Sequence, residues 1–536
     1  MNETFARAFA LHQQGEIEQA KDLYESILES DAKHFDALHM LGVTLIDENA
    51  IRAFKLLVKA IEINPSEPLC FNSAGNALIK LEEFALALDC YCEALKLEPN
   101  FWQARANAAL ALHYLKRHTE ALVYSNEVIN SAPSNANIFC DRGEIYAAIG
   151  HYDLALVDFG EAIALDPHNP KFYVARGSAH QALDSFTCAI KDLNHAISLD
   201  PLLADAHLKL ALLYLQNGNY ELGWRNYAWR WKQKNLDSEP LQSVKPYWQP
   251  LPENKHLAIA SLPAQCRFLV WAEQGLEDHI FFGGLLLELQ KIVPHLIVQI
   301  DAGLIPLYER GMPGITFYPS NCAINDALYD VHLPMGDLAG LFRNNLDDFL
   351  GVKTQYLLAN QEQVAAVHEQ ISRKNEIVIG IAWQSKNRVS GIKAAPDLEE
   401  FMNAFNIPGV RLVNLQYGDF DEDMDALQSR YLVDIVQPNQ VHQESNLDGL
   451  ATIISACDLI ISADNITAHL AGALNIPCWL LLPKAPSWRW LSDVTLTPWY
   501  PSIRIYRQEI AGEWGAVLQK IQADLLPMLK TDTLYN

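Results

Sequence analysis

The chain has 536 residues, of which 50% are apolar and 20% charged, a composition typical of soluble globular proteins with several domains. Its formal net charge of -25 argues against nucleic acids and anionic membrane surfaces as partners, because both are themselves negatively charged. No apolar run reaches the roughly 20 residues that a transmembrane helix needs. The first 20 residues are amphipathic and mixed in charge rather than signal-like, so we expect a cytoplasmic protein.

Residues 1–231 repeat with a period of about 34 residues, the period of tetratricopeptide repeats. The segments 75–99, 143–167 and 177–201 align directly: each opens with Gly, has Ala at the same two later places, and ends with Pro. Small residues such as Gly143 and Ala155 let two antiparallel helices approach closely, and Pro167 ends the second helix. We predict seven helix pairs, beginning near residues 1, 34, 68, 102, 136, 170 and 204, that form a superhelix. The concave face of such arrays usually binds a peptide or protein, although the repeats alone are equally compatible with a pure scaffold.

The repeat pattern is lost at residues 232–255, which gain proline and are interpreted as a linker that packs through Trp248. From residue 256 onward, short apolar runs alternate with helical stretches, which predicts parallel sheets covered on both faces. A break near 360–376 divides the runs into two sets. We therefore expect two Rossmann-like halves, residues 256–370 and 371–536, that face a cleft, with ligands at the carboxyl ends of the strands.

The segment "LIISADNITAHLAGALNIP", from Leu459 to Pro477, is the first turn with a chemical pattern. It predicts a buried strand, a polar turn with Asp464 and Asn465, and a helix that starts near Thr467 and carries His469 in its first turn. The free N–H groups and the dipole of such a helix favour an anion, and His469 could donate to a phosphate oxygen. The alternative is a plain capped helix in which His469 is a buried structural hydrogen bonder.

The second turn is "WAEQGLEDHIFF", in which a predicted strand ends at Ala272 and a helix follows. Gln274, Glu277 and Asp278 would then lie at the edge of the cleft. A carboxylate there could act as a general base. Alternatively, Asp278 only caps the helix.

The third turn, "WQSKNRVSGIKAAPDLEEF", follows the predicted strand "IVIGIAW" and contains Ser385, Lys386 and Lys393. A lysine in this loop could neutralise a diphosphate, and a solvated basic loop is the alternative. A fourth turn, "NLQYGD", could offer Gln416 or Tyr417 to a base or ribose.

Several other signals argue against further chemistries. The acidic run 418–425 has D-x-D spacings but is typical of a solvated helix face, so we expect no metal site. The sequence has no GxxxxGK[ST] and no GxGxxG, the phosphate-binding patterns of ATP hydrolysis and NAD chemistry. We accordingly expect no cofactor beyond a bound substrate.

From the end of the repeats onward, the sequence resembles a bacterial family of tetratricopeptide-repeat proteins with a glycosyltransferase-like domain of two Rossmann halves, the GT-B fold. Flagellin glycosyltransferases are similar in arrangement, and bacterial ADP-heptose transferases more distantly so. The motifs that carry the resemblance are "GWRNYAWRW", "WAEQGLEDHIFF", "YDVHLPMGDL", "VNLQYGD", "DNITAHLAGALNIPCWLLLP", "SWRW", "TPWYPSIRIYRQ" and "GEW".

The resemblance implies a role for each polar turn. Asp278 would be the general base, and Lys393, or else Lys386, would bind phosphate. The turn after the strand at 459–463 would grip the phosphates of a nucleotide sugar. The donor-binding residues on this reading are Gln274, Ser385, Lys386, Lys393, Gln416, Tyr417, Asp464, Asn465, Thr467 and His469. The sequence departs from the family pattern at Glu277, where Gly is usual, at Asn465, where Thr is common, and at Ala394, where Ser is usual.

The implied function is a protein glycosyltransferase that moves a sugar from a nucleotide donor to a hydroxyl of a protein acceptor recruited by the repeats, flagellin being the acceptor that the resemblance suggests. Helix N–H groups and lysine can stabilise the leaving phosphate without a divalent metal, and a single displacement would invert the sugar's configuration. The alternative is a non-catalytic adaptor or chaperone with a degenerate transferase domain. Glu277 supports that alternative, because a glutamate beside donor phosphates would repel them.

Overall fold

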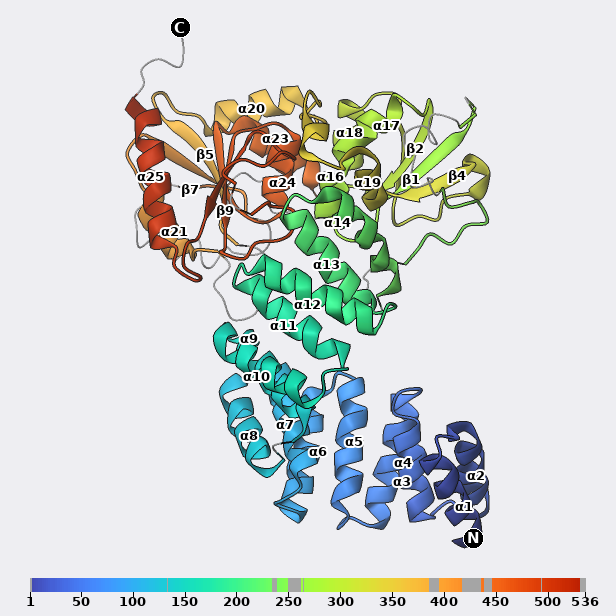
Figure 1. Ribbon diagram of the computed structural model, residues 1–536. Coiled ribbons are helices and arrows are strands. Elements are labelled where there is room, and N and C mark those ends of the chain that lie inside the picture. Colours follow the sequence, from blue (N-terminus) through green and yellow to red (C-terminus); the bar gives the residue numbers. More distant parts are fainter. Residues whose placement is uncertain are drawn as a thin grey trace. The chain divides into compact units, whose positions relative to one another are not determined.

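The computed structural model (Figure 1) consists of two compact units, Met1–His180 and Gln181–Asn536. The division falls inside the predicted repeat region and not at its end. Each unit is described by itself. The residues that the structure describes are 2–132, 134–233, 239–248, 262–263, 265–384, 395–416, 435–437, 446–492 and 494–530.

The first unit is built of helix pairs, and the pairs begin where the repeat pattern predicts them. Gly143 permits the close approach within one pair, because a Cβ there would lie 2.6 Å from a ring carbon of Phe159. Gly75 does the same against Tyr91, at 2.4 Å. The helices are α1 (Asn2–Gln13), α2 (Ile17–Ser30), α3 (Phe35–Thr44), α4 (Ala50–Ile63), α5 (Pro68–Lys80), α6 (Phe84–Leu97), α7 (Trp102–Tyr114), α8 (His118–Ser131), α9 (Ala136–Ala148), α10 (Tyr152–Leu165) and α11 (Pro170–Ala182).

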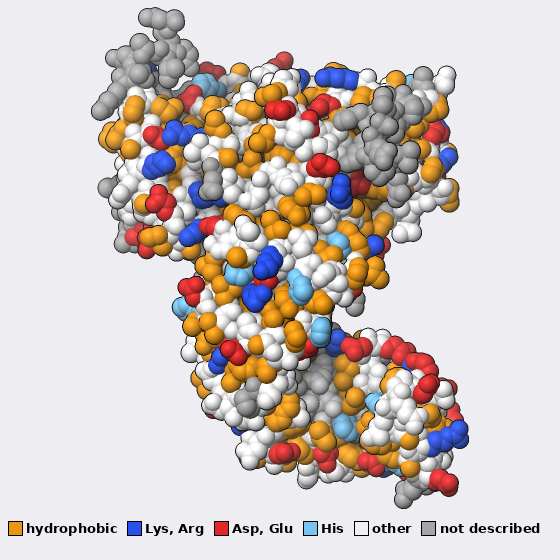
Figure 2. All heavy atoms as spheres, in the orientation of Figure 1, with side chains coloured by type: hydrophobic (Ala, Val, Ile, Leu, Met, Phe, Trp, Pro, Cys, Tyr) orange, Lys and Arg blue, Asp and Glu red, His pale blue; other side chains and the backbone are white. Residues whose placement is uncertain are grey.

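The second unit opens with the last helices of the repeat pattern, α12 (Phe186–Leu199), α13 (Ala204–Gln216) and α14 (Tyr220–Tyr227), and with the 3-10 helix η1 (Ala228–Lys232). Up to residue 233 the described part of the chain therefore contains seven helix pairs, as predicted. The last helix is short and continues as η1, in line with the different end of the seventh repeat. Acidic side chains are visible along the first helix pairs in Figure 2, in keeping with the net charge of -25.

The first α/β half holds a parallel four-stranded sheet in the order β3-β2-β1-β4. Its strands are β1 (Arg267–Trp271), β2 (His295–Ile300), β3 (Thr316–Pro319) and β4 (Val331–Pro334). Its helices are α16 (Leu276–Phe281), η2 (Gly283–Leu285), α17 (Leu286–Gln290), α18 (Ile305–Gly311), η3 (Asp326–Leu328), η4 (Met335–Leu338), α19 (Ala339–Phe342) and η5 (Leu346–Phe349). The strand order reverses between β1 and β4, so the turn after β1 lies at a topological switch point, where such sheets bind ligands.

The second half holds a parallel six-stranded sheet in the order β10-β9-β8-β5-β6-β7, which is the doubly wound order 3-2-1-4-5-6 read from the other edge. Its switch point lies between β5 and β8. The strands are β5 (Ile377–Ala382), β6 (Val410–Asn414), β7 (Ile435–Val436), β8 (Leu459–Ala463), β9 (Cys478–Leu482) and β10 (Ile503–Arg507). The helices are α20 (Gln361–Ile371), α21 (Leu398–Phe405), α23 (Leu447–Ala456), α24 (Ile466–Ala473) and α25 (Gly515–Lys530).

Aromatic side chains join the last repeat helix to both halves of the α/β region. The ring of Trp224 in α14 lies 6.2 Å from Phe282 of the first half and 5.9 Å from Trp488 of the second, measured between centroids. Tyr227 lies 5.8 Å from the same Trp488. Trp248, in the predicted linker, is buried and packs on Phe268 at 5.8 Å. None of the helices in the described ranges is both long and apolar enough to cross a membrane.

Candidate functional site

The two switch-point turns of the α/β region meet where α16 packs against α24 (Figure 1). The turn after β1 contributes Asp278, and the turn after β8 contributes Asp464 and His469. A segment after β9, with Trp488, Arg489 and Trp490 of the "SWRW" motif, supplies the cation between them. This cluster is the candidate site, and its carboxylates, imidazole and guanidinium are buried or nearly so.

Asp278 lies in the first turn of α16 and forms an ion pair with Arg489, whose Nη2 is 2.5 Å from Asp278 Oδ1. The two side chains are only 6% and 12% exposed. The position before the helix belongs to Gly275, and the helix start has no side-chain cap. Asp278 is therefore neither a helix cap nor an open carboxylate at the cleft edge, since it is held by a cation.

Arg489 is surrounded by negative charge. Burial lowers its pKa, but the carboxylates of Asp278, Glu277 and Asp464 outweigh burial and raise the pKa above the usual range. Its guanidinium also lies over two rings, 5.1 Å from the centroid of Trp488 and 5.9 Å from that of Phe281. Arg489 is therefore a permanent cation.

Burial raises the pKa of Asp464, while the indole N–H of Trp490 and then the charge of Arg489 oppose that rise. His469 is fully buried. Burial and then the charge of Arg489 lower its pKa well below the usual value, so its imidazole is neutral. Its Nδ1 is 3.1 Å from the hydroxyl of Tyr500, and its ring stacks on Trp490 at 5.3 Å. Its Nε2 has no hydrogen-bond partner among the described residues and lies 3.9 Å from Asp464 Oδ1.

Asn465 is the N-cap of α24: its side-chain oxygen accepts from the backbone N–H of Thr467 at 2.9 Å. Its amide nitrogen donates to the carbonyl of Gln384, just after β5, also at 2.9 Å. The Thr467 hydroxyl contacts the carbonyl of Leu415 at 3.5 Å. Asn465 therefore fills the capping role expected where Thr is common, and in addition fixes the ends of β5 and β8 to each other.

Gln416 follows β6 and lies in the same strand-end group. Its side-chain oxygen accepts from the backbone N–H of Gln384 at 2.7 Å. The structure thus brings Gln416, Asn465 and Thr467 together in one group, and Asp278, Asp464 and His469 in another. The predicted donor residues Ser385, Lys386, Lys393 and Tyr417 lie outside the described residues.

A second buried ion pair joins the turn before α16 to the 3-10 helix η1. Arg230 of η1 donates Nε and Nη2 to the carboxylate of Glu273 at 2.8 and 2.6 Å, and Nη2 also to Asp337 at 2.6 Å. Gln274 has a positive φ of 60°, and its amide donates to the hydroxyl of Tyr227 at 3.4 Å.

Glu277 is a half-buried residue of α16 and is not among the described residues with positive φ, so its backbone does not require the usual Gly.

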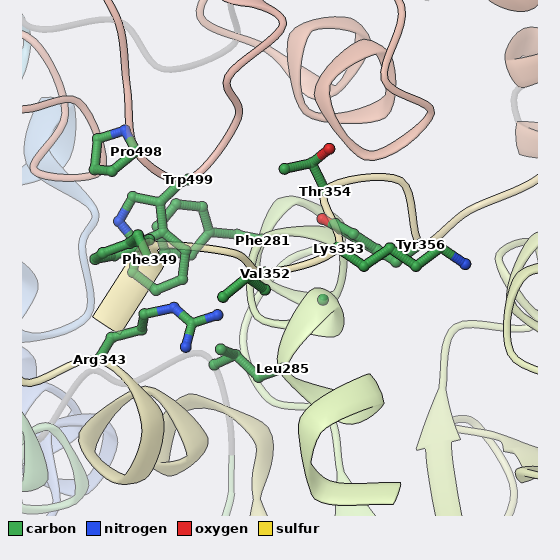
Figure 3. A pocket seen from close by; sticks show the side chains of 11 residues that line it. Phe281, Leu285, Arg343, Phe349, Val352, Lys353, Thr354, Tyr356, Pro498 and Trp499 are labelled. Carbon is green, nitrogen blue, oxygen red and sulfur yellow. The ribbon is translucent and has the colours of Figure 1, made fainter. Parts of the chain in front are cut away.

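A small pocket adjoins the cluster, and Figure 3 shows side chains that line it. Phe281 forms one wall of the pocket and also touches the cluster through Arg489. Trp499 faces Phe281, with ring centroids 4.2 Å apart. The other wall includes Arg343, which pairs with Glu288 at 2.5 Å. The pocket is lined by side chains from both halves, Phe281, Gly284, Leu285, Arg343, Phe349, Val352, Lys353, Thr354, Tyr356, Pro498 and Trp499.

Metal ligands are not grouped in the described ranges, where no three His, Cys, Asp or Glu side chains could share an ion. The acidic run 418–425 falls outside those ranges. The expectation that no metal is needed therefore stays a prediction. Sequence reasoning missed Arg489 as a site residue, because its partner Asp278 lies 211 positions away in the chain.

Comparison with known proteins identifies the repeats. Residues 143–184 match the family "TPR repeat", and residues 72–136 match the family "Tetratricopeptide repeat". A thermophilic TPR protein of known structure from Thermus thermophilus is 21% identical, with a TM-score of 0.32, and the match covers 34% of this chain and 99% of that one. A tetratricopeptide repeat protein from Parabacteroides merdae gives 14% identity, a TM-score of 0.38, and coverage of 42% and 90%.

One curated relative spans most of the chain. Protein FlbA of Caulobacter vibrioides is 25% identical over 491 residues, which are 88% of this chain and 69% of FlbA. Anaphase-promoting complex subunit 3 of Schizosaccharomyces pombe is 28% identical over 165 residues, 29% of this chain and 24% of that protein. The chain is thus a tetratricopeptide-repeat protein with a distant relative named FlbA.

Proposed function

We propose that the protein is a glycosyltransferase that moves a sugar from a nucleotide donor to a hydroxyl of a protein acceptor bound by the repeats. The observation that carries the proposal is the buried cluster of Asp278, Asp464, His469 and Arg489 at the place where two doubly wound sheets meet. The resemblance of the sequence motifs to the GT-B family supports the same reading. The acceptor flagellin rests on that resemblance alone.

In this mechanism the donor phosphate binds at the start of α24. The N–H groups of the first helical turn offer partial positive charge, and the neutral imidazole of His469 offers a ring nitrogen that has no partner among the described side chains. Lys386 and Lys393 are proposed to add charge to the same phosphate. Asp278 takes the proton of the acceptor hydroxyl while that oxygen attacks the anomeric carbon and the phosphate leaves. A single displacement inverts the configuration at that carbon, and we propose that no metal takes part.

The repeats are proposed to recruit the acceptor. Across neighbouring helix pairs of the first unit, the Nδ2 of Asn107 donates to the side-chain oxygens of Asn72 and Asn76, at 2.9 and 3.0 Å. The Nδ2 groups of Asn72 and Asn76 and the side-chain oxygen of Asn107 take no part in these bonds, and we propose that they meet a peptide backbone. Their side chains come from α5 and α7, so the proposed acceptor surface is made of successive first helices of the repeats.

The second candidate is a non-catalytic adaptor, and the Asp278–Arg489 ion pair favours it. A carboxylate that is paired and 6% exposed is poorly placed to accept a proton from a substrate. In that case the repeats bind partners and the α/β region serves as structural support.

Thermal unfolding in the presence of nucleotides separates the two candidates. A transferase must show a raised midpoint with at least one of UDP, GDP, ADP or CMP, since ligands that bind the folded state stabilise it by about 2.7 kcal/mol at 100 times Kd. The shift should be lost in Lys393→Ala and kept in Lys520→Ala, a lysine of α25 in the same half. If none of the four nucleotides changes the thermal midpoint, the result favours the adaptor.

A further inference from the structure

The Asp278–Arg489 ion pair differs in geometry from two other buried pairs of the protein. Arg230 grips Glu273 with both Nε and Nη2, and Arg142 grips Asp158 with both Nε and Nη2, at 2.8 and 2.7 Å. This side-on fork is the strong geometry for arginine with carboxylate or phosphate.

Arg489 uses only half of that fork on Asp278. Its Nη2 donates to Asp278 at 2.5 Å, while its buried Nε has no hydrogen-bond partner among the described residues. Its Nη1 contacts the hydroxyl of Ser487 at 3.3 Å, an ordinary neutral contact. A buried N–H without a partner destabilises the folded state, so the cluster is incompletely satisfied.

A second unsatisfied nitrogen lies in the same cluster. His469 is fully buried, and its Nε2 has no partner within the described part of the chain. Its separation of 3.9 Å from Asp464 is too long for a hydrogen bond. The Asp464 carboxylate lies near both nitrogens, since its negative charge interacts with the Arg489 guanidinium and its Oδ1 is the atom 3.9 Å from His469 Nε2. A ligand with several acceptor oxygens would satisfy both nitrogens, and a phosphate is such a group.

We infer that Arg489 is an anion-binding residue of the donor site, and that a phosphate of the bound nucleotide replaces Asp278 as the partner of its guanidinium. This inference rests on the proposed function and deepens it. The phosphate accepts from Nε and Nη2 together, and Asp278 loses its cation. Because the carboxylate is released only when the donor is in place, the general base becomes available in the complex that needs it. No bond is made or broken in this exchange of ion-pair partners.

The inference makes binding of the nucleotide and pairing of Asp278 compete for one guanidinium. Removal of the carboxylate charge must then tighten nucleotide binding, and removal of the guanidinium must weaken it. A carboxylate that simply stands beside the donor also repels the phosphates, but the gain in affinity from Asp278→Asn would then persist in the Arg489→Gln background. The competition therefore distinguishes Arg489 as a ligand-binding residue from Arg489 as a structural partner.

The test is isothermal titration of the full-length protein with the nucleotide that raises its midpoint, and with inorganic pyrophosphate. We expect Asp278→Asn to bind at least 5-fold more tightly than the wild type, and Arg489→Gln at least 10-fold more weakly. In the double variant, the gain from Asp278→Asn should vanish. Asp524→Asn, which removes a half-exposed carboxylate from Arg504 in the same half, is the matched control and should bind as the wild type does.

Equal affinity of Arg489→Gln and wild type would overturn the inference and leave the proposed function standing, since the donor would then bind elsewhere in the site. Binding by neither the wild type nor Asp278→Asn would overturn both. If Asp278→Asn fails to fold, Arg489→Lys decides instead, because lysine keeps the charge but lacks the fork. Lysine at that position must weaken binding, and wild-type affinity there would refute the exchange.

Discussion

Replacement of Arg230 by methionine tests how strongly the last repeat helix is fixed to the first α/β half. The Arg230 side chain is 1% exposed and makes three hydrogen bonds to carboxylates, two to Glu273 and one to Asp337, besides one to the carbonyl of Tyr227. Taken singly, such bonds contribute about 1.5–3 kcal/mol each, but burial of the charges offsets part of the sum. Methionine would leave the Glu273 carboxylate, 2% exposed, without its cation. We therefore expect a loss of about 3–5 kcal/mol in the free energy of unfolding.

Urea unfolding followed by tryptophan fluorescence measures this loss, because the ring of Trp231 lies 4.8 Å from the guanidinium carbon of Arg230. Arg225→Met, in the preceding helix α14, is the control, since Arg225 pairs with Glu221 in an exposed i,i+4 pair and the change should cost less than about 0.5 kcal/mol. Adding Glu273→Gln to Arg230→Met should restore part of the stability, because the amide removes the unpaired charge. If Arg230→Met destabilises the protein no more than Arg225→Met does, the reasoning is refuted.

Two further outcomes concern Asp141 in the first unit and Gly336 beside Glu273. The pKa of Asp141 is raised to about 7, first by burial and then by Glu144. Because the folded state holds this proton more tightly than the unfolded chain, stability falls as pH rises from about 4 to about 7, and the loss is complete above that pH. Asp141→Asn should therefore stabilise the protein by about 1–2 kcal/mol at pH 8.5, seen as a higher thermal midpoint, and by much less at pH 5.5. The control Glu161→Gln removes an exposed carboxylate and should leave the midpoint unchanged at both pH values. An equal effect of Asp141→Asn at both pH values contradicts the argument. Gly336→Ala would place a Cβ 2.5 Å from the fixed carboxylate of Glu273 and should cost about 1–3 kcal/mol in urea unfolding, and an unchanged midpoint would show that this contact relaxes freely.

Local patterns predicted much of the fold. The repeat period placed the helix starts, for example at Pro68 and Pro170, because each repeat buries its small residues against its own partner helix. Continuous apolar runs marked strands such as β5 and β8, since strands covered on both faces carry no polar alternation. Strands β4 and β10 were not marked, because Val331–Pro334 is short and Ile503–Arg507 is interrupted by arginines.

Local sequence patterns predict only part of the candidate site. Turn positions after β1 and β8 could be read from the sequence, and Asp278, Asp464 and His469 were chosen from them. The ion pair that joins Asp278 to Arg489 spans 211 positions in the chain, and only the packing of α16 on α24 brings the two together. The pairing of Arg230 with Glu273 has the same origin, since it depends on how η1 meets the end of β1. Pairings of this kind follow from topology and not from local pattern.

The aromatic contacts of α14 bear on how such a protein could be assembled from parts in evolution. Trp224 contacts Phe282 and Trp488, one from each half, and its indole donates to the carbonyl of Arg343 at 2.6 Å. A gene fusion that joined a foreign repeat array at residue 232 would lose these contacts and expose the rings to water. A fusion point inside the array, near the division at Gln181, would keep them. The number of repeats can therefore change by recombination upstream, while the last helices are inherited together with the α/β region.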